Sequence, residues 1–341
     1  MWAAERGAFL SRMERELATV LDPLLPRGVR CALVDFPDYG NVGDSAIWLG
    51  EMDYLRRIGA SVVYACDLAS FSPARLRERL EDGVILLSGG GNLGDLWPAH
   101  QRLREAVIKA FPDHRIIQLP QSVHFDDKAA LDRARAAFDA HSQLVLLLRD
   151  HRSLAFARGE FGAPCLLCPD LSLALGPLAR RPARRDVLWL LRGDQEARNQ
   201  GPAPLGVESV DWLEEPRSWL LRANRLLSEP RSWPATLQAW TWPALASFYD
   251  RVWEALARER LSRGCALLSE GEVVVTDRLH GHLLSVLLGI PHVVLDNSYG
   301  KIRDYYDTWT HSCGLTHWAT TPEEASLLAR RLGTLAPAGS A

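Results

Sequence analysis

Short apolar runs alternate with amphipathic stretches through the first half of the chain. Such runs are typical of strands that are buried on both faces of a parallel sheet. The predicted strands are Val29–Phe36, Ser61–Ala65, Val84–Leu87, His114–Leu119 and Leu144–Leu148. Helical periodicity follows at Gly43–Ile58, after Ser72-Pro73, and at Lys128–Phe138. Strand–helix alternation of this kind predicts an open parallel α/β sheet.

A polar segment with clustered arginines, Gly176–Asp186, interrupts this pattern and marks a domain boundary. Beyond it we predict strands at Val187–Leu191, Glu272–Thr276 and His292–Leu295. The expected division is an N-terminal α/β domain over residues 1–178, a C-terminal α/β domain over 184–333, and a disordered tail at 334–341. Two Rossmann-like domains should then face a cleft, with ligands at the carboxyl ends of the strands.

Composition narrows the class of protein. The chain has 341 residues, and its net charge of −3 gives no reason to expect nucleic-acid binding. No stretch approaches the ~18 apolar residues of a membrane helix, and the N-terminus lacks the pattern of a signal peptide, so we expect a cytoplasmic protein. Cys165 and Cys168 lack a second pair to complete a zinc site, so the cysteines are predicted to be buried thiols.

Two polar loops of related sequence follow strands of the first half. Asn41, Gly43 and Asp44 stand in the first loop; the second contains Gly90, Asn92 and Asp95. They could be tight turns capped by Asn and Asp, but their repetition favours a polar floor for sugar hydroxyls. Neither is a nucleotide-binding fingerprint.

Cationic residues follow other strands. Arg149 lies directly after one predicted strand, and Arg278 and His280 lie between another strand and a helix. Surface salt bridges or a buried structural histidine would explain them, but the positions also suit anion binding and proton transfer. His280 and His282 are two apart on a helix and do not share a face, which argues against a metal site. Lys301 and Arg192 add charge to the same edge.

The sequence with these motifs resembles the polysaccharide pyruvyltransferase family. The resemblance is carried in order by Asp38–Trp48, Leu86–Trp97, Gln118–Phe125, Leu147–Ala157, Cys168–Gly176, Leu190–Glu196 and Val274–Ile302. It implies a fold like that of two-domain GT-B glycosyltransferases, phosphoenolpyruvate as donor and a sugar acceptor in extracellular polysaccharide synthesis. It also implies that Arg149, Arg278, Leu279 and His280 contact the donor.

The expected reaction forms a cyclic ketal and releases phosphate, with no cofactor and no metal. His280 and Arg278 are the candidate catalytic residues on the donor side, which is expected to be the C-terminal domain. Asp44, Asp95 and His124 are the candidates that orient or deprotonate a lipid- or nucleotide-linked acceptor on the N-terminal side. A nucleotide-sugar glycosyltransferase and a plain sugar-binding protein are the rival hypotheses.

Six tryptophans mark the segment Asp211–Trp253, together with several arginines. Core packing or stacking on sugars would explain them. The alternative is peripheral contact with the inner face of the cytoplasmic membrane. These tryptophans are Trp212, Trp219, Trp233, Trp240, Trp242 and Trp253.

Overall fold

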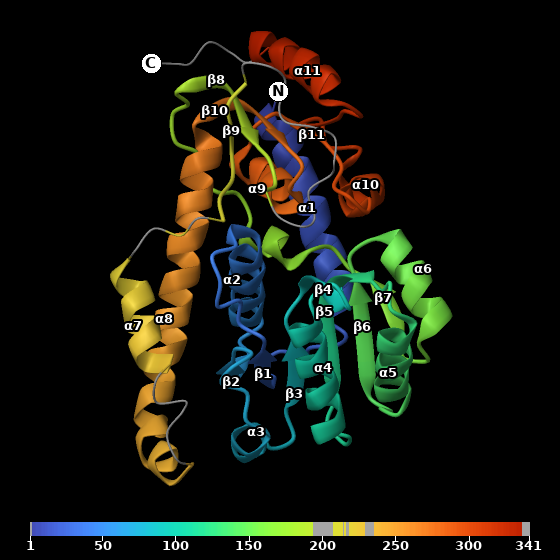
Figure 1. Cartoon of the computed structure of the whole chain (residues 1–341), viewed down its shortest axis with the longest axis vertical. Helices are drawn as coiled ribbons and strands as arrows, with labels where there is room; N and C mark the ends of the chain where they lie inside the picture. Colours follow the sequence, from blue (N-terminus) through green and yellow to red (C-terminus); the bar gives the residue numbers. More distant parts are fainter. Residues whose placement is uncertain (1, 194–206, 214, 216–217, 229–234, 336–341) are drawn as a thin grey trace.

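The computed structural model describes residues 2–193, 207–213, 215, 218–228 and 235–335, and of residues 223, 225–228, 235–250 and 335 only the backbone. Its first sheet is parallel throughout, with strand order β2-β1-β3-β5-β6-β7 and β4 paired to β5 (Figure 1). The strands are β1 (Arg30–Val34), β2 (Ser61–Cys66), β3 (Val84–Leu87), β4 (Gly90–Gly94), β5 (Ile116–His124), β6 (Leu144–Leu148) and β7 (Cys165–Leu167).

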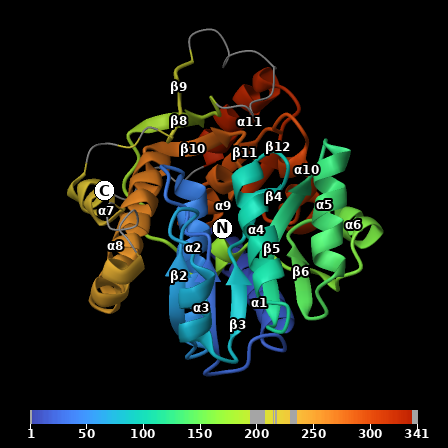
Figure 2. The same ribbon diagram turned by 60° about the horizontal axis from the view of Figure 1, so that its bottom comes forward.

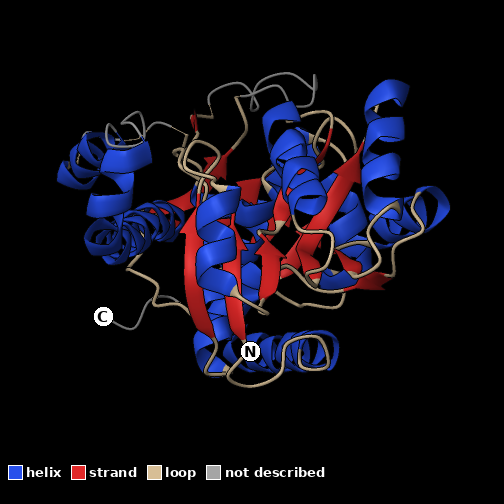
Figure 3. Cartoon of the chain, turned by 90° about the horizontal axis from the view of Figure 1, so that it is seen from below, coloured by secondary structure: helices blue, strands red, loops and turns tan. Residues whose placement is uncertain are grey.

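Helices lie on both faces of this sheet (Figure 3). They are α1 (Trp2–Leu21), α2 (Val42–Arg57), α3 (Pro73–Leu80), α4 (Pro98–Ala110), α5 (Lys128–Asp139), α6 (His151–Glu160) and the short η1 (Leu171–Leu175). Asn41 caps α2 and Asp127 caps α5, each accepting a backbone N–H. Such caps satisfy amides that have no partner within the helix.

The second sheet is also parallel, with strand order β12-β11-β10-β8-β9. Its strands are β8 (Arg185–Leu190), β9 (Ser209–Val210), β10 (Gly271–Thr276), β11 (His292–Val294) and β12 (Thr316–Trp318). Its helices are α7 (Trp219–Ser228), α8 (Ala235–Ser269), α9 (Leu279–Leu288), α10 (Lys301–Tyr305), η3 (Tyr306–Thr310) and α11 (Pro322–Leu335). The long α8 runs beside both sheets (Figures 1 and 2).

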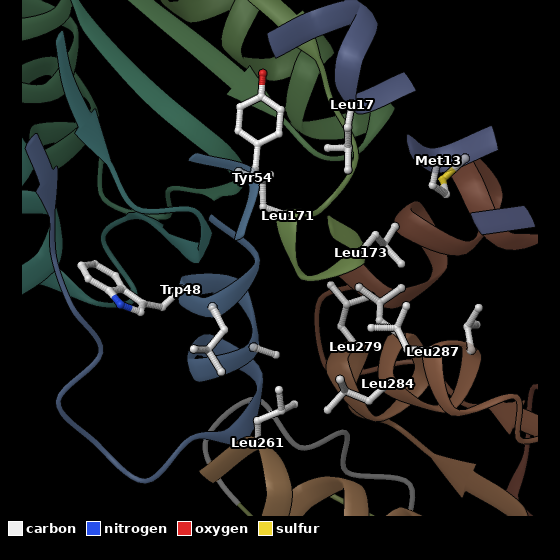
Figure 4. Close-up of a cluster of buried hydrophobic side chains, with 14 of the residues drawn as sticks. Met13, Leu17, Trp48, Tyr54, Leu171, Leu173, Leu261, Leu279, Leu284 and Leu287 are labelled. Atoms are coloured by element: carbon white, nitrogen blue, oxygen red, sulfur yellow. The ribbon is translucent and has the colours of Figure 1, made fainter. Parts of the chain in front are cut away.

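One hydrophobic core is shared by the two sheets. Because side chains alternate along a strand, Leu33 of β1 faces this shared core while Ala32 faces the outer helices. Helices α1, α2, α8 and α9 fill the space between the sheets with leucines and aromatic residues (Figure 4). Each sheet also has its own outer core, covered by α3–α6 on the first and by α11 on the second.

Helix α1 ties the two halves together. Near its start, Arg6 donates to the carbonyl of Leu287 in α9. Just beyond its end, Asp22 accepts from the hydroxyl of Tyr54 in α2 at 2.9 Å. Met13 and Leu17 pack in the shared core between these two points (Figure 4). The sheets are therefore held by a common layer of side chains as well as by the connecting chain.

Most predicted strands and helices are present, within a few residues at their ends. Two expectations differ. The glycine-rich segment predicted as a loop contains strand β4, and β5 continues to His124, because the two pair beyond the end of β3. Of the predicted tail 334–341, residues 334 and 335 belong to α11 and the remainder lies outside the described residues. Within the described part of the chain, no helix is long and apolar enough to span a membrane.

The described tryptophans of the segment Asp211–Trp253 mostly pack inside the protein. Trp212 is buried, and Trp253 stacks on Phe36 with ring centroids 4.9 Å apart. Trp219, by contrast, is 72% exposed. Trp233, Trp240 and Trp242 lie outside the residues whose side chains are described. Core packing therefore accounts for Trp212 and Trp253.

The cysteines are free thiols, and all but the partly buried Cys265 are buried. Cys165 is the first residue of β7 and Cys168 directly follows the strand; burial raises the pKa of both thiols, which is typical of inert thiols.

Two buried histidines, one at the start of β11 and one in α9, form a hydrogen-bonded chain. His292 Nδ1 lies 2.8 Å from the carbonyl of Ile290, so it donates there and its Nε2 accepts from His282 Nδ1 at 2.6 Å. His282 Nε2 in turn accepts from the Thr310 hydroxyl at 2.9 Å. Burial lowers the pKa of His292 to about 4 and that of His282 well below its usual value. His282 is thus a packed structural residue.

This pair makes a testable contribution to acid sensitivity. The unfolded chain binds protons on these histidines below about pH 6.5 and the folded protein does not, so the pair lowers stability as pH falls from 6.5 towards 4. We expect urea unfolding at pH 7, 6 and 5 to give the free energy of unfolding of each protein. Between pH 6 and 5, this free energy should fall by about 1 kcal/mol less in His292→Gln than in the wild type. His311→Gln, at an exposed position, should keep the wild-type pH dependence. Identical pH dependence in His292→Gln and wild type would contradict the prediction.

Candidate active site

A pocket of about 330 Å³ lies where the carboxyl ends of the strands of one sheet meet those of the other. Its volume is at the lower end of the range typical of small-molecule sites. From the first half it is lined by Tyr39, Asn41, Asp44, Gly91, Asn92, Trp97, His100 and Arg149. From the second half it is lined by Arg192, Trp212, Leu213, Arg278, Leu279, His280 and Lys301. Parallel α/β sheets place loops with binding residues at this edge.

Arg149 stands at the end of β6 and is 1% exposed. Its Nη1 donates to Asp170 Oδ2 at 2.8 Å, and its Nε donates to the Ser122 hydroxyl at 2.9 Å. The Trp309 indole donates to its carbonyl, which adds a contact from the second half. These bonds fix the guanidinium and leave Nη2 facing Gly91.

Asp170 is a buried carboxylate shared by the two halves. It binds Arg149, and its Oδ2 lies 3.4 Å from His280 Nε2. Burial by itself would raise the pKa of Asp170, but the charges of His280 and Arg149 hold it well below its usual value. Asp170 is therefore an anion that orients a cation on one side and an imidazole on the other.

The glycine run ahead of Asn92 lets cations approach the backbone. A methyl group on Gly91 would lie 3.0 Å from Arg149 Nη2 and 3.7 Å from Lys301 Nζ. The run is held from below by Glu51, whose carboxyl accepts from the Gly89 amide at 2.7 Å. Burial raises the pKa of Glu51 to about 8 despite this bond. Two cations from different halves thus converge on one point of the floor.

Arg278 and Arg192 line the opposite side of the pocket, at the ends of β10 and β8. Arg278 donates to Asp211 at 2.6 Å and stands over the Trp212 ring, 5.9 Å from its centroid. Asp277 accepts from the Arg192 amide at 2.8 Å, and burial raises the pKa of this carboxyl to about 6. Arg278 is also the N-cap of α9, and Leu279 and His280 of the first turn line the pocket, so the positive end of the helix dipole lies beside it.

The first loop predicted for the acceptor enters the pocket in part. Asn41 Oδ1 accepts from the Gly43 amide, and its Nδ2 donates to Asp44 Oδ2 at 2.7 Å. Asn41 and Asp44 line the pocket, whereas Gly43 lies against His280. A Cβ on Gly43 would come within 2.4 Å of His280 Nδ1, so the glycine provides the space that the histidine occupies.

The second loop contributes less than its sequence predicts. Asn92 lines the pocket and accepts from Gln121 at 2.8 Å. Asp95 instead accepts from the backbone amide of Asp126 at 2.8 Å, and His124 pairs with the Asp126 carboxylate. Neither Asp95 nor His124 lines the pocket, and the local polar bonds explain both residues. Gly90, at φ 137°, lies beside Asp44 and also stays outside the lining.

Comparison with known proteins identifies the family. A family model described as polysaccharide pyruvyl transferase matches residues 41–299, which is more than half of the chain. The chain belongs to the polysaccharide pyruvyl transferase family. It is 36% identical over 299 residues to Pyruvyl transferase 1 of Schizosaccharomyces pombe, covering 84% of this chain and 71% of that protein. It is 32% identical over 301 residues to EpsO of Bacillus subtilis, described as a candidate pyruvyl transferase, covering 87% and 90% respectively.

A solved structure shares the fold of this polysaccharide pyruvyl transferase family member. It is a functionally uncharacterised protein from Klebsiella pneumoniae, with a TM-score of 0.59 and 19% sequence identity. The match covers 91% of this chain and 99% of that one. The α/β fold with two parallel sheets therefore extends beyond close sequence relatives.

Several residues that line the pocket of this family member, and Asp170 behind it, escape prediction from sequence. Asp170 lies in the Cys168–Gly176 motif, so its position after a strand was an available signal. Trp97 ends another of the motifs that carry the family resemblance, but a tryptophan suggests packing as readily as binding. His100 lies on an ordinary amphipathic helix, and nothing in the sequence separates it from a structural histidine. The remaining lining residues not predicted are Tyr39, Gly91, Trp212 and Leu213.

The contact between Gly43 and His280 can be tested directly. Gly43→Ala should displace the imidazole and lower turnover by roughly 100-fold, because misplacement of about an ångström has that effect on catalytic groups. Alanine favours helix, so the loss would not come from the backbone of α2. Gly7→Ala in α1, where a Cβ meets nothing within 4 Å, is the matched control. Steady-state kinetics with the variant at the wild-type rate would refute the steric argument.

Proposed function

We propose that this enzyme transfers the pyruvyl carbons of phosphoenolpyruvate to a sugar of an exopolysaccharide precursor as a cyclic ketal, releasing phosphate. The observation that carries the proposal is the convergence of four cationic side chains in one small pocket. They are Arg149, Arg192, Arg278 and Lys301. Phosphoenolpyruvate carries a phosphate and a carboxylate, and fixed guanidinium groups are well suited to bind both.

The pairing of these cations supports two anion positions. Arg149 and Lys301 meet at Gly91, while Arg278 and Arg192 lie at the strand ends of the second sheet. Such an arrangement can hold the carboxylate with one pair and the phosphate with the other. The N-terminus of α9 adds partial positive charge near the second pair.

The chemistry requires a proton donor at the methylene carbon of phosphoenolpyruvate. The double-bond electrons take up a proton at that carbon, and an acceptor hydroxyl oxygen bonds to the central carbon. Phosphate then leaves with the electrons of its C–O bond, and a second hydroxyl closes the ring. Of the two hydroxyl protons, one balances the hydrogen that the new methyl group gains, and the other leaves with hydrogen phosphate. His280, oriented by Asp170, is the candidate for protonating the methylene carbon.

Neutral and acidic groups on the first half suit the acceptor. Asn41, Asp44 and Asn92 offer amide and carboxylate groups that can bind sugar hydroxyls. The acceptor is expected to be a lipid- or nucleotide-linked sugar. The names of the two relatives, which describe pyruvyl transferases, agree with this proposal.

Removing an arginine tests the donor assignment. Arg278→Ala should raise the KM for phosphoenolpyruvate by roughly 10–100-fold, since a hydrogen bond to a charged group contributes about 1.5–3 kcal/mol. The measurement is phosphate release with a panel of nucleotide- and lipid-linked sugars. Arg102→Ala, exposed on α4, should leave the KM unchanged. Unaltered donor kinetics in folded Arg278→Ala would remove Arg278 from the donor site.

Replacing His280 separates binding from chemistry. His280→Gln should still bind phosphoenolpyruvate in calorimetry but lose about 10²–10⁴-fold in kcat, the usual contribution of an acid–base group. A near wild-type kcat would exclude His280 from proton transfer. If the wild type bound no phosphoenolpyruvate and bound a nucleoside diphosphate sugar instead, the glycosyltransferase hypothesis would replace this one.

A further inference from the structure

A buried histidine–aspartate pair lies on the first-half side of the pocket. His100, in the first turn of α4, is 8% exposed and lines the pocket. Its Nδ1 lies 2.8 Å from Asp35 Oδ2 and 3.0 Å from Oδ1. Asp35 directly follows β1 and is itself 8% exposed. The pair is separate from the Asp170–His280 contact, which involves another strand end.

The hydrogen bond fixes which nitrogen of His100 can accept a proton. Since Asp35 can only accept as a carboxylate, Nδ1 carries the hydrogen and Nε2 of the neutral ring keeps its lone pair. In the described part of the chain, Nε2 makes no hydrogen bond to protein. The ring therefore presents a basic nitrogen while its other nitrogen is held by a carboxylate, the arrangement of a general base and its orienting group.

The backbone at Asp35 is strained in a way that serves this pair. Its φ is 83°, a value that residues other than glycine rarely adopt. The amides of Asp35 and Phe36 both donate to the carbonyl of Cys66, which holds the turn at the end of β1. Strain of this kind persists where the surroundings enforce it and is concentrated at functional sites. Here the turn places the carboxylate beneath His100.

The surroundings of His100 suit a sugar ring. Tyr39 lies edge-on to the imidazole, with ring centroids 5.9 Å apart, and Trp97 is the N-cap of the same helix. Both residues line the pocket and are 38% exposed. Exposed aromatic faces with a polar tip bind ligands that are apolar on one side and polar on the other.

We propose that His100 is the general base that deprotonates the acceptor hydroxyl, with Asp35 as its positioning residue. This inference rests on the proposed function. As the hydroxyl oxygen bonds to the central carbon of phosphoenolpyruvate, its proton passes to His100 Nε2, while the methylene carbon takes a proton from His280. After phosphate departs, the second hydroxyl closes the ring and gives up its proton. Of the two hydroxyl protons, one returns to His280 and the other leaves with hydrogen phosphate. Both histidines thereby regain their starting protonation states.

The test compares donor binding with acceptor-dependent turnover. His100→Asn keeps a side-chain N–H that can donate to Asp35 but has no basic nitrogen. We expect phosphoenolpyruvate affinity in calorimetry to stay within 3-fold of wild type and acceptor-dependent phosphate release to fall about 10²–10⁴-fold. His114→Asn, whose ring bonds the carbonyl of Glu81 outside the pocket, is the matched control and should keep the wild-type rate.

Two further measurements separate a base from a structural role. In His100→Gly, added imidazole should restore part of the turnover, which a merely structural histidine would not allow. Asp35→Asn should lower kcat without raising the KM for phosphoenolpyruvate, and combining it with His100→Asn should lower kcat no further than His100→Asn alone.

The outcomes distinguish this inference from the proposed function. No phosphate release by the wild type with any acceptor would overturn both. Wild-type release combined with a near wild-type kcat in His100→Asn would overturn the base assignment alone. Loss of phosphoenolpyruvate binding in folded His100→Asn would assign His100 to the donor side and also overturn it.

Discussion

The buried carboxylate of Asp170 is the interaction on which the pocket depends. A carboxylate removed from water costs several kcal/mol unless it is paired and hydrogen-bonded, and breaking such a pair strands the remaining charge. Arg149 supplies the pairing from the first half, and the Ser172 amide donates a further bond at 2.9 Å. His280 reaches the same carboxylate from the second half. The imidazole of His280 occupies space beside Gly43 that a methyl group at this position would fill. These contacts together fix the relative position of the two halves at the pocket.

The shared hydrophobic core makes that position rigid. If the two sheets had separate cores, the pocket between them could open at the cost of a modest interface. Instead α1, α2, α8 and α9 contribute to one continuous layer, and separating the sheets would expose it (Figure 4). Close-packed protein interiors have few alternative arrangements. The charged groups at the pocket therefore keep their distances without help from a ligand.

Local patterns predicted the fold well because they depend on neighbouring residues. Runs such as Leu144–Leu148 are apolar throughout since both faces of the sheet are covered. The position of Arg149 directly after that strand suffices to place it at the ligand-binding edge. Pairings between distant segments were not predictable in this way. Only the tertiary fold brings Asp35 to His100, and the same is true of Asp211 and Arg278. Asp95 has the same sequence signature as Asp44, yet its carboxylate accepts from a loop amide outside the pocket.

Pairing with aspartates explains how a cationic pocket can be both stable and ready to bind. Unpaired guanidinium groups would repel one another and remain mobile, so binding would have to order them. Asp170 and Asp211 instead fix Arg149 and Arg278 when the chain folds, and each guanidinium has further N–H groups beyond those that its aspartate accepts. Electrostatic preorganisation of this kind places charge where negative charge develops without rearrangement during reaction. The aspartates lower the net positive charge, but they supply the fixed geometry that the proposed loss of phosphate requires.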